Sequence, residues 1–305
     1  IIFEYNGFII SSYGLMLMLA FLICNYLLRE YLISINEDSS KADDIIFYAA
    51  IGGIVGSKIY YIIEENKLYE TYVAIINIFK GLFTINFELL ASGISGFGGG
   101  LVFLGGLIGG MLSVTYYIYK NNMNWLETAD WVAPYLALGH SIGRIGCFLV
   151  GDCYGKACDL PWAMSFPNGI PPTLEHVHPT QLYESLFGFL IFLYLIVVRK
   201  KYYFQNNLNK KGFVMYEYLF LAGLLRFLVE FIRVNPTYAF GLSGAQFISV
   251  AMMLLGAVFY IQDQASILEH LPSKYSYFLG CSRHSQFYLK SLSLLIANQD
   301  FHPKG

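Results

Sequence analysis

The chain has 305 residues, of which 56% are hydrophobic and only 13% are charged, and its formal net charge is −2 at pH 7. Soluble globular proteins carry about 25% charged residues, so this composition excludes a soluble enzyme and a disordered protein, and the slightly negative charge offers no basic surface for nucleic acid. With a mean hydropathy of +0.52, much of the chain is expected to face lipid, which predicts a polytopic membrane protein.

Seven apolar runs are each long enough for a membrane-spanning helix, which needs about 20 mostly apolar residues. They cover about 12–30, 44–63, 98–119, 131–150, 180–198, 213–233 and 243–262. Backbone polar groups cannot stay unpaired in lipid, and the alternation typical of barrel strands is absent. We therefore predict an all-α membrane domain of about seven helices over residues 1–262, followed by a tail of unknown role over 263–305.

Two segments between these runs have a different pattern. The run 72–83 is too short to span a membrane and contains Lys80, so we predict an interfacial or re-entrant helix there. The segment 151–179 holds five of the nine prolines, and proline blocks the continuation of a helix. This segment is expected to form an ordered, non-helical cap over one face of the bundle.

The lysines and arginines predict the orientation of the chain, because basic residues accumulate in cytoplasmic loops. With seven spans, the tail and the loops on its side carry 12 basic residues, whereas the opposite side carries three. The N-terminus and the segment 151–179 are therefore predicted to lie outside, and the tail in the cytoplasm. Nothing basic precedes the first apolar run, so no cleavable signal peptide is expected.

Four basic residues lie inside the predicted spans: Lys58, Arg144, Arg226 and Arg233. Each costs about 2.5–3.5 kcal/mol at the centre of a membrane helix, and such residues usually face the protein interior and serve a function. Near the end of a span, a long basic side chain can instead extend to the lipid headgroups. That alternative stays open for Arg233, whereas the deeper Arg144 and Arg226 indicate a site.

The predicted orientation brings the unusual polar content of five spans to the outer leaflet. The spacing of Arg226, Glu230 and Arg233 places all three on one stripe of a helix. The other residues concerned are Tyr13, Gly14, Gly98, Gly99, Gly100, Gly105, Gly106, Arg144, Gln181, Tyr183 and Glu184. Guanidinium groups grip phosphate bidentately, and helix glycines let lipid chains or other helices approach closely. The pattern predicts a site for an anionic lipid headgroup.

The sequence GRIGCFLVGDCYG at residues 143–155 resembles the signature of the phosphatidylglycerol–prolipoprotein diacylglyceryl transferases. Four further motifs occur along the chain in the same order as in that family: SYGLM at 12–16, GG at 105–106, HPTQLYE at 178–184 and RFLVEFIR at 226–233. The resemblance covers about residues 5–262 and leaves the tail outside it. A single Gly-Arg-x-Gly is a weak signal, whereas five motifs in order on seven predicted spans are a specific one.

The resemblance implies an integral protein of the bacterial plasma membrane, with seven spans, an outward N-terminus and a site facing the outer leaflet. Its reaction is the transfer of the diacylglyceryl group of phosphatidylglycerol to the lipobox cysteine of a prolipoprotein, with release of glycerol phosphate. The expected partners are therefore phosphatidylglycerol, prolipoprotein substrates and membrane lipids, without nucleic acid. Neither a metal nor another cofactor is expected.

By the same resemblance, Arg144 and Arg226 would bind the phosphate and stabilise the departing charge, and Glu230 would hold them as the third catalytic residue. Tyr13 would position the headgroup, and Gly155 would allow a tight loop. The full set of expected substrate-binding residues is Tyr13, Gly105, Gly106, Gly143, Cys147, Asp152, Gly155, His178, Tyr183, Glu184 and Arg233.

The chain departs from the family pattern at three polar positions. The histidine of the third span falls on Leu104, the asparagine of the signature on Cys147, and its glutamate on Asp152. Leucine can neither hydrogen bond to a headgroup nor move a proton, and His140 and His178 are the candidates for a base. These departures favour, as alternatives, a transferase of the same fold with another acceptor or lipid, or a non-catalytic lipid-binding or transport protein. A transporter is expected to place polar residues near the midplane, which the outer cluster disfavours.

Five cysteines are too few for a disulfide scaffold in a chain of this length. Cys153 and Cys158 lie in the predicted outer segment, where a disulfide could form. Cys147, Cys153 and Cys158 also lie near histidines and Asp152, but their spacing matches no familiar zinc pattern. The prediction is therefore a site without metal, with the disulfide left open.

Overall fold

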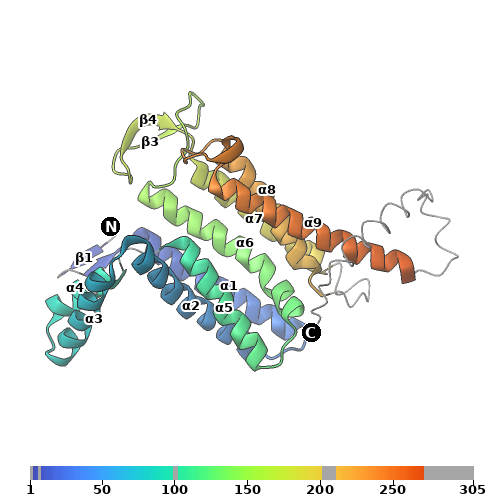
Figure 1. Cartoon of the computed structure of the whole chain (residues 1–305), viewed down its shortest axis with the longest axis horizontal. Helices are drawn as coiled ribbons and strands as arrows, with labels where there is room; N and C mark the ends of the chain where they lie inside the picture. The colour runs from blue at the N-terminus through green and yellow to red at the C-terminus, as the bar shows by residue number, and fades with distance from the viewer. Residues whose placement is uncertain (1–2, 6–7, 99–101, 201–210, 271–305) are drawn as a thin grey trace, which may run out of the picture.

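The computed structural model describes residues 3–5, 8–98, 102–200 and 211–270 and is mainly helical (Figure 1). The helices are α1 (Ser12–Ser34), α2 (Ser40–Glu65), α3 (Leu68–Phe83), α4 (Phe87–Gly98), α5 (Phe103–Lys120), α6 (Trp125–Val150), α7 (Thr180–Lys200), α8 (Phe213–Glu230) and α9 (Gly244–His270), with a 3₁₀ turn, η2 (Ala239–Gly241). The strands form two antiparallel hairpins, β1 (Phe3–Tyr5) with β2 (Phe8–Ile10) and β3 (Met164–Phe166) with β4 (Thr173–Val177).

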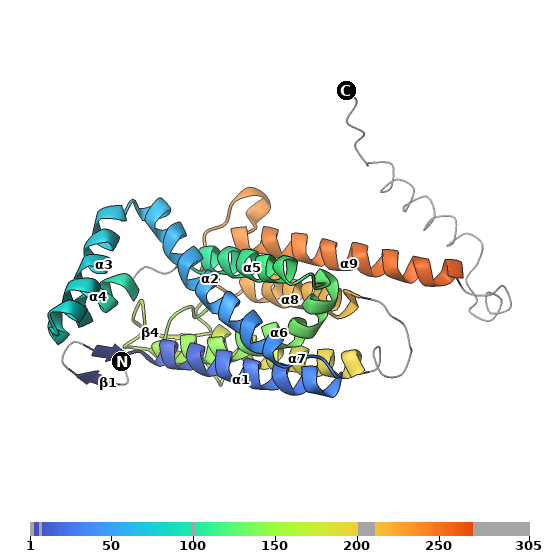
Figure 2. The same cartoon turned by 90° about the horizontal axis from the view of Figure 1, so that it is seen from below.

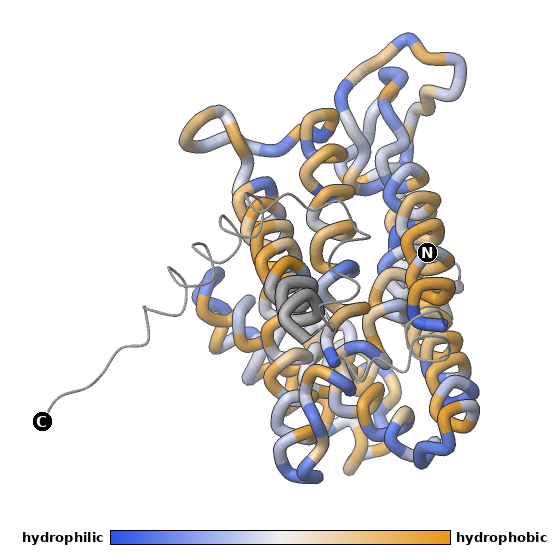
Figure 3. Tube along the Cα trace, turned by 90° about the vertical axis from the view of Figure 1, so that its right-hand side faces the viewer, coloured by the Kyte–Doolittle hydropathy of each residue, from blue (hydrophilic) through white to orange (hydrophobic). Residues whose placement is uncertain are grey.

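The predicted all-α membrane class is confirmed, because each of the seven predicted runs lies mainly in one helix of the bundle. By length and composition, α1, α2, α7 and the part of α9 at Gly244–Ile261 could each cross a membrane. Hydrophobic residues run along the helices, whereas hydrophilic residues gather at the turns and in the cap (Figure 3). The number of seven spans and the orientation remain predictions. The tail beyond residue 270 lies outside the described residues.

Helix α6 lies in the middle of the bundle, with α1, α2 and α5 on one side and α7, α8 and α9 on the other (Figure 1). Its contact with α1 is a core of buried side chains that includes Leu28 and Leu32 of α1 and Trp131 and Leu138 of α6. On the other side, α6 packs on α7 and α8, and α9 covers α8. Residues near both ends of α6 can therefore reach two neighbouring helices.

The pair α2 and α5 packs closely through glycines. A Cβ atom at Gly56 of α2 would collide with the backbone of Gly105 and Gly109, and one at Gly109 would collide with Gly52 and Gly56. Small residues at such positions let two helix backbones approach closely in a membrane. The glycines of the third predicted span are thus explained first by helix packing.

The run 72–83, predicted as an interfacial or re-entrant helix, lies in α3, which begins at Leu68 and is followed by a second short helix, α4. Helix α4 was not predicted, and its presence moves the start of the third bundle helix to Phe103. The pair lies at the same end of the bundle as both hairpins (Figure 2). Phe97 of α4 covers Lys58, whose ammonium group lies 5.2 Å from the centre of that ring, so Lys58 is buried by protein.

The segment 151–179 contains no helix, as its prolines predict, and carries the β3–β4 hairpin. Its first residues attach it to two other parts of the chain. The N–H of Gly155 donates to the carbonyl of His178 at 2.9 Å, and the N–H of Lys156 donates to the carbonyl of Ile232 at 2.8 Å. The cap is therefore tied to the chain just beyond α8.

The opposite end of the bundle buries two charged residues that join α6, α7 and α8. Arg199 lies in the last turn of α7, where its guanidinium group stacks 3.5 Å from the centre of the Tyr31 ring. Asp130 of α6 is fully buried and accepts hydrogen bonds from the backbone N–H of Gly212 at 2.6 Å and of Met215 at 2.9 Å. Asp130 thus satisfies N–H groups at the start of α8, which otherwise lack partners.

We expect the substitution Asp130→Ala to lower the free energy of unfolding by about 2–4 kcal/mol, because it leaves two buried N–H groups without an acceptor. The measurement is thermal unfolding of the detergent-solubilised protein, followed by intrinsic fluorescence. Glu127→Ala is the matched control, since Glu127 lies on the same helix and its ion pair with Lys211 is partly exposed to solvent. The control should change stability by about 0–1 kcal/mol, and equal effects of the two substitutions would contradict the assignment.

Candidate active site

Six charged or titratable side chains meet at the end of the bundle that carries the cap. His140 and Arg144 come from the last turns of α6, Glu184 from the first turns of α7, Arg226 and Glu230 from the last turns of α8, and Arg233 from the turn beyond it. Sequence reasoning predicted that the polar ends of these helices converge, and the ion pairs between them confirm it. We call these six residues the arginine cluster.

Glu184 is the centre of the arginine cluster, with only 1% of its side chain exposed. Its Oε2 atom lies 2.8 Å from Nε of Arg144 and 3.3 Å from Nε2 of His140. Its Oε1 atom lies 3.0 Å from Nη1 of Arg226 and 3.4 Å from Nη1 of Arg233. One buried carboxylate therefore joins three guanidinium groups from two helices and a turn.

Glu230 is the second buried carboxylate of the cluster. Its Oε2 atom lies 2.9 Å from Nη2 of Arg226, one helical turn away, as the i, i+4 spacing predicts. Its Oε1 atom accepts hydrogen bonds from Asn235 at 2.5 Å and from the hydroxyl of Ser243 at 2.8 Å. Glu230 is thus held in place by the loop that leads to α9, and it fixes Arg226 in turn.

The prediction of a single helical stripe for Arg226, Glu230 and Arg233 is wrong in one respect. Helix α8 ends at Glu230, and Arg233 lies in a following turn closed by a hydrogen bond from its N–H to the carbonyl of Glu230. Arg233 nevertheless reaches Glu184 and is 10% exposed. Its direction comes from the turn and from the adjoining cap strand, where residues 155 and 233 form a β-bridge.

The aromatic and histidine residues of the predicted site lie around the cluster. Tyr13 packs against the last turns of α6, since a Cβ atom at Gly146 would be 3.2 Å from its ring. The hydroxyl of Tyr183 accepts a hydrogen bond from Trp162 at 2.7 Å and lies 3.4 Å from Nδ1 of His178. Tyr183 and His178 therefore join the start of α7 to the cap.

The glycines of the predicted site separate into two groups. Gly105 and Gly106 were expected to bind substrate, but their close neighbours are Tyr60, Gly56 and Ser57 of α2, so their place is in the α2–α5 contact. By contrast, a Cβ atom at Gly143 would meet nothing within 4 Å, so no neighbouring group requires glycine there. At Gly155, a Cβ atom would lie 2.6 Å from the carbonyl oxygen of Ile232, so only glycine lets the cap lie against the end of α8.

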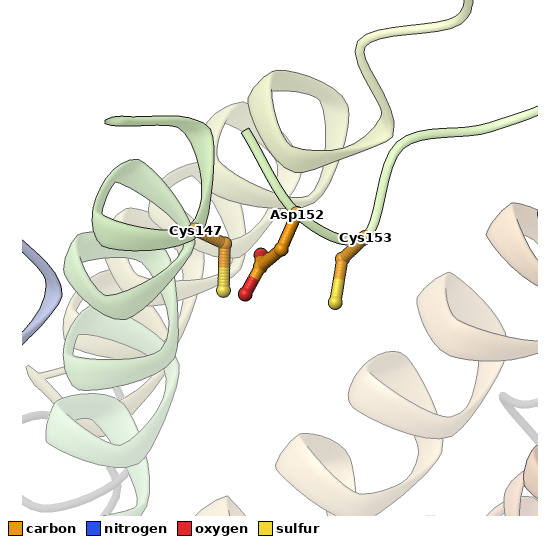
Figure 4. Close-up of side chains that lie close together, drawn as sticks. All are labelled: Cys147, Asp152 and Cys153. Carbon is orange, nitrogen blue, oxygen red and sulfur yellow. The ribbon is translucent and has the colours of Figure 1, made fainter. Parts of the chain in front are cut away.

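Three residues next to Arg144 form a compact group of thiols and a carboxylate: Cys147 at the end of α6, and Asp152 and Cys153 in the loop that follows (Figure 4). Their sulfur and carboxylate atoms all lie within 4.8 Å of one another. Nη1 of Arg144 donates a hydrogen bond to the sulfur of Cys147 at 3.8 Å. The described cysteines are free thiols, so the disulfide between Cys153 and Cys158 that was left open above is absent.

The surroundings of this group change its titration. A hydrogen bond with Cys147 and the guanidinium groups of Arg233 and Arg144 lower the pKa of the Cys153 thiol, although burial acts against them. Burial, and then the charge on Cys153, raise the pKa of the Asp152 carboxyl to about 6. The loop after α6 therefore favours a negatively charged sulfur beside the arginines.

A sequence model described as prolipoprotein diacylglyceryl transferase matches residues 1–262 of the chain. The chain belongs to this family. It is 36% identical to the phosphatidylglycerol–prolipoprotein diacylglyceryl transferase of Clostridium tetani over 270 residues. These residues cover 87% of this chain and 97% of that relative. It is 36% identical to transferase 2 of Clostridium perfringens over 262 residues (84% and 92%) and 32% identical to the transferase of Finegoldia magna over 268 residues (88% and 96%).

Membership of the diacylglyceryl transferase family makes the chain a transferase of the membrane. All six residues of its arginine cluster were singled out from sequence, but the arrangement that joins them was not. The central position of Glu184 was missed, although the residue was among the expected substrate contacts. Asn235 and Ser243, which hold Glu230, were missed altogether. The HPTQLYE motif signals that Glu184 matters, but no spacing in the sequence indicates that its partners lie 40 and 42 residues away.

Proposed function

We propose that the chain transfers the diacylglyceryl group of phosphatidylglycerol to the lipobox cysteine of prolipoproteins and releases glycerol phosphate. The observation that carries this proposal is the arginine cluster, in which Glu184 gathers three guanidinium groups at one end of an apolar bundle. A lipid phosphate needs this combination of fixed positive charge and nearby apolar surface. The family membership and the named activity of the relatives support the same reaction.

Arg144 and Arg226 are the phosphate contacts in this proposal, because they are more open than Arg233. Their side chains are 15% and 26% exposed, against 10% for Arg233. Each guanidinium group has five N–H donors, so the bonds to Glu184 and Glu230 leave donors for phosphate oxygens. Glu184 and Glu230 hold the guanidinium groups of Arg144 and Arg226 in position before the lipid binds, which avoids reorganisation during the reaction.

In the reaction, the acceptor sulfur attacks the glyceryl carbon that carries the phosphate ester. A C–S bond forms, the C–O bond breaks, and its electron pair leaves with glycerol phosphate, while the thiol proton passes to solvent or to the departing phosphate. Negative charge grows on the leaving phosphate, and Arg144 and Arg226 stabilise that charge. His140, 3.3 Å from Glu184, and His178 are the histidines that could accept the thiol proton.

The test is to purify the protein, add phosphatidylglycerol and a synthetic lipobox peptide, and measure the peptide by mass spectrometry. We expect a mass gain of one diacylglyceryl group, and no gain with a peptide in which the cysteine is replaced by serine. A lipidating relative serves as the positive control. No product under conditions in which the relative is active would refute the proposal.

A second candidate is a transferase of the same fold that uses another acceptor or lipid. The observation that favours it is the change of three family positions to Leu104, Cys147 and Asp152. Peptide lacking a lipobox, or an anionic lipid other than phosphatidylglycerol, would then give the better yield in the same assay. A preference for phosphatidylglycerol and the lipobox peptide would exclude it.

We further place the cluster at the outer leaflet of the bacterial plasma membrane, with the N-terminus outside and the tail in the cytoplasm. The distribution of basic residues supports this orientation. A cysteine introduced at Leu174, an exposed position of the cap, should react with an impermeant maleimide added to intact cells. A cysteine at Asn122, in the turn between α5 and α6 at the other end, should react only after lysis, and the reverse pattern would overturn the orientation.

A further inference from the structure

Two of the three positions at which the chain departs from the family pattern lie side by side in the structure. Cys147 stands where the family has asparagine and Asp152 where it has glutamate, and both side chains meet Cys153 (Figure 4). All three side chains point to the same side, with the Asp152 carboxylate between the two sulfur atoms. The departures therefore do not simply delete polar groups; they create a set of two thiols and one carboxylate.

This set has the chemistry of a metal site with an open position. Zn²⁺ binds cysteine sulfur at about 2.3 Å and aspartate oxygen at about 2.0–2.2 Å, and its catalytic sites keep three protein ligands and one free place. Such a geometry separates neighbouring ligand atoms by about 3.5–3.8 Å, so atoms that already lie within 4.8 Å of one another need to approach by at most about 1.3 Å. Cys147 sits on the end of a helix, which fixes one ligand while the following loop adapts.

The carboxyl group of Asp152 interacts with the thiols of Cys147 and Cys153, which are weak hydrogen-bond donors. Its Oδ1 atom is buried and accepts no hydrogen bond from an N–H or O–H group of the described residues. A buried carboxylate oxygen without a strong donor is destabilising, and a bound cation removes that cost. By contrast, the backbone carbonyl of the same residue is satisfied by the side chain of Gln181.

The charges around the group also balance with a divalent cation. The guanidinium groups of Arg144, Arg226 and Arg233 are matched by the carboxylates of Glu184, Glu230 and Asp152. Both cysteine ligands of a metal are thiolates, and they add two negative charges to these matched groups. A divalent cation neutralises these two charges, whereas a monovalent cation leaves one of them in a partly buried site.

We propose that Cys147, Asp152 and Cys153 bind a thiophilic divalent cation, Zn²⁺ above all, whose fourth position takes the thiol of the acceptor cysteine. The use of that position rests on the proposed function, whereas the binding of the cation itself does not. Thiolate ligands select zinc over magnesium and calcium. Arg144 contacts both Cys147 and Glu184, so a sulfur held on this cation lies beside the phosphate held by the arginines.

The role of the cation in transfer is to supply the attacking sulfur as thiolate without a histidine at the position of Leu104. A coordinating thiol loses its proton to solvent; the sulfur then forms the C–S bond, and the electron pair of the broken C–O bond leaves with glycerol phosphate. The thioether product carries no charge and is not among the usual zinc ligands, so it leaves the site. No oxidant or reductant is required.

Cobalt binding tests the site without any reliance on activity. The protein is purified in detergent with a non-thiol reductant, freed of metal with a chelator, and titrated with Co²⁺. We expect one Co²⁺ per chain, with the intense thiolate-to-cobalt absorption of a tetrahedral site, and displacement of the signal by Zn²⁺. Addition of a lipobox peptide should change the spectrum, whereas the serine peptide should leave it unchanged.

Matched variants assign that signal to the three residues. Cys147→Asn with Asp152→Glu, which restores the family residues, and Cys153→Ser should each abolish the absorption. Cys158→Ser and Cys24→Ser, which remove cysteines outside the group, should retain it. Absence of the absorption in the unsubstituted protein, or its survival in Cys153→Ser, would overturn the metal site.

Activity then separates this inference from the proposed function. A free cysteine is about 3% thiolate at pH 7, so removal of the cation should slow transfer about 10–30-fold, and Zn²⁺ should restore the rate. Transfer at the full rate without metal would overturn the role of the cation and leave the proposed function standing. A third outcome is a cobalt site whose spectrum does not change with acceptor peptide, in a protein that makes no product. That outcome would support the metal site but refute both the proposed function and the use of the fourth position by the acceptor.

Discussion

The substitution Glu184→Gln should lower the rate of diacylglyceryl transfer by about 10²–10³-fold or more while the protein stays folded. Glu184 joins Arg144, Arg226 and Arg233 through one buried carboxylate, and removal of one partner from a buried ion pair costs about 3–5 kcal/mol. Each 1.36 kcal/mol changes a rate tenfold. Glutamine keeps the shape of the side chain but leaves three guanidinium groups without their shared negative charge. The groups then repel one another and are no longer held in position.

Glu217→Gln is the matched control for this experiment. Glu217 is a half-buried carboxylate of α8 that belongs to the other half of the helix, away from the arginine cluster. Both variants should elute as single species and give similar thermal transitions in detergent, so that loss of activity in Glu184→Gln reports the site. A transfer rate within a few-fold of the unsubstituted protein would show that Glu184 has no part in organising the arginines.

The substitutions Arg226→Ala and Arg144→Ala should each abolish transfer, with a loss of about 10³-fold or more. Each removes a proposed charge-assisted, bidentate phosphate contact and also leaves a buried carboxylate partly unpaired. Arg226→Lys keeps the positive charge but not the planar fork that bonds to phosphate and to both carboxylates, so it should recover only a small part of the activity. The same peptide assay measures all three variants.

Two comparisons make the arginine result specific. Arg29→Ala removes an exposed arginine paired with Asp43 on the other side of the bundle, and it should leave transfer within about twofold, as expected for a surface ion pair. Arg233→Lys should retain more activity than Arg226→Lys, because Arg233 is the least exposed of the three and acts through Glu184. Full activity in Arg144→Ala or Arg226→Ala would refute the phosphate assignment.

The helices could be predicted from sequence because apolar runs of about 20 residues have few other structures available to them in lipid. Helix α4 was not predicted, because its 12 residues include glycines and serine and its stability comes from packing on α3, which no local pattern reveals. The ends of α8 could not be fixed either. Its start depends on Asp130, 82 residues earlier, and its end on a turn that Arg233 closes.

The members of the site could largely be predicted, but their roles could not. Charged residues inside an apolar run are expensive, so Arg144 and Arg226 stand out from the sequence alone. Glu184 lies at the first turns of a helix, where a carboxylate is common, and only the three-dimensional arrangement identifies it as the shared partner of three arginines. Gly105 and Gly106 were expected to bind substrate but pack against α2. A glycine in a membrane helix does not reveal from sequence whether its neighbour is lipid or another helix backbone.

The attachment of the cap to the turn after α8 links events on the two sides of the active site. Gly155 lies against the carbonyl of Ile232, the N–H of Lys156 bonds to the same carbonyl, and its ammonium group bonds to the carbonyl of Phe231 at 3.0 Å. Arg233 follows at once in the chain, so a displacement of the cap is transmitted to that guanidinium group over one residue. Under the proposed function, an acceptor that displaces the cap on entry would alter the hold on lipid phosphate, and bound lipid would alter the affinity for acceptor by the same factor. In kinetic terms, the two substrates would then not bind independently.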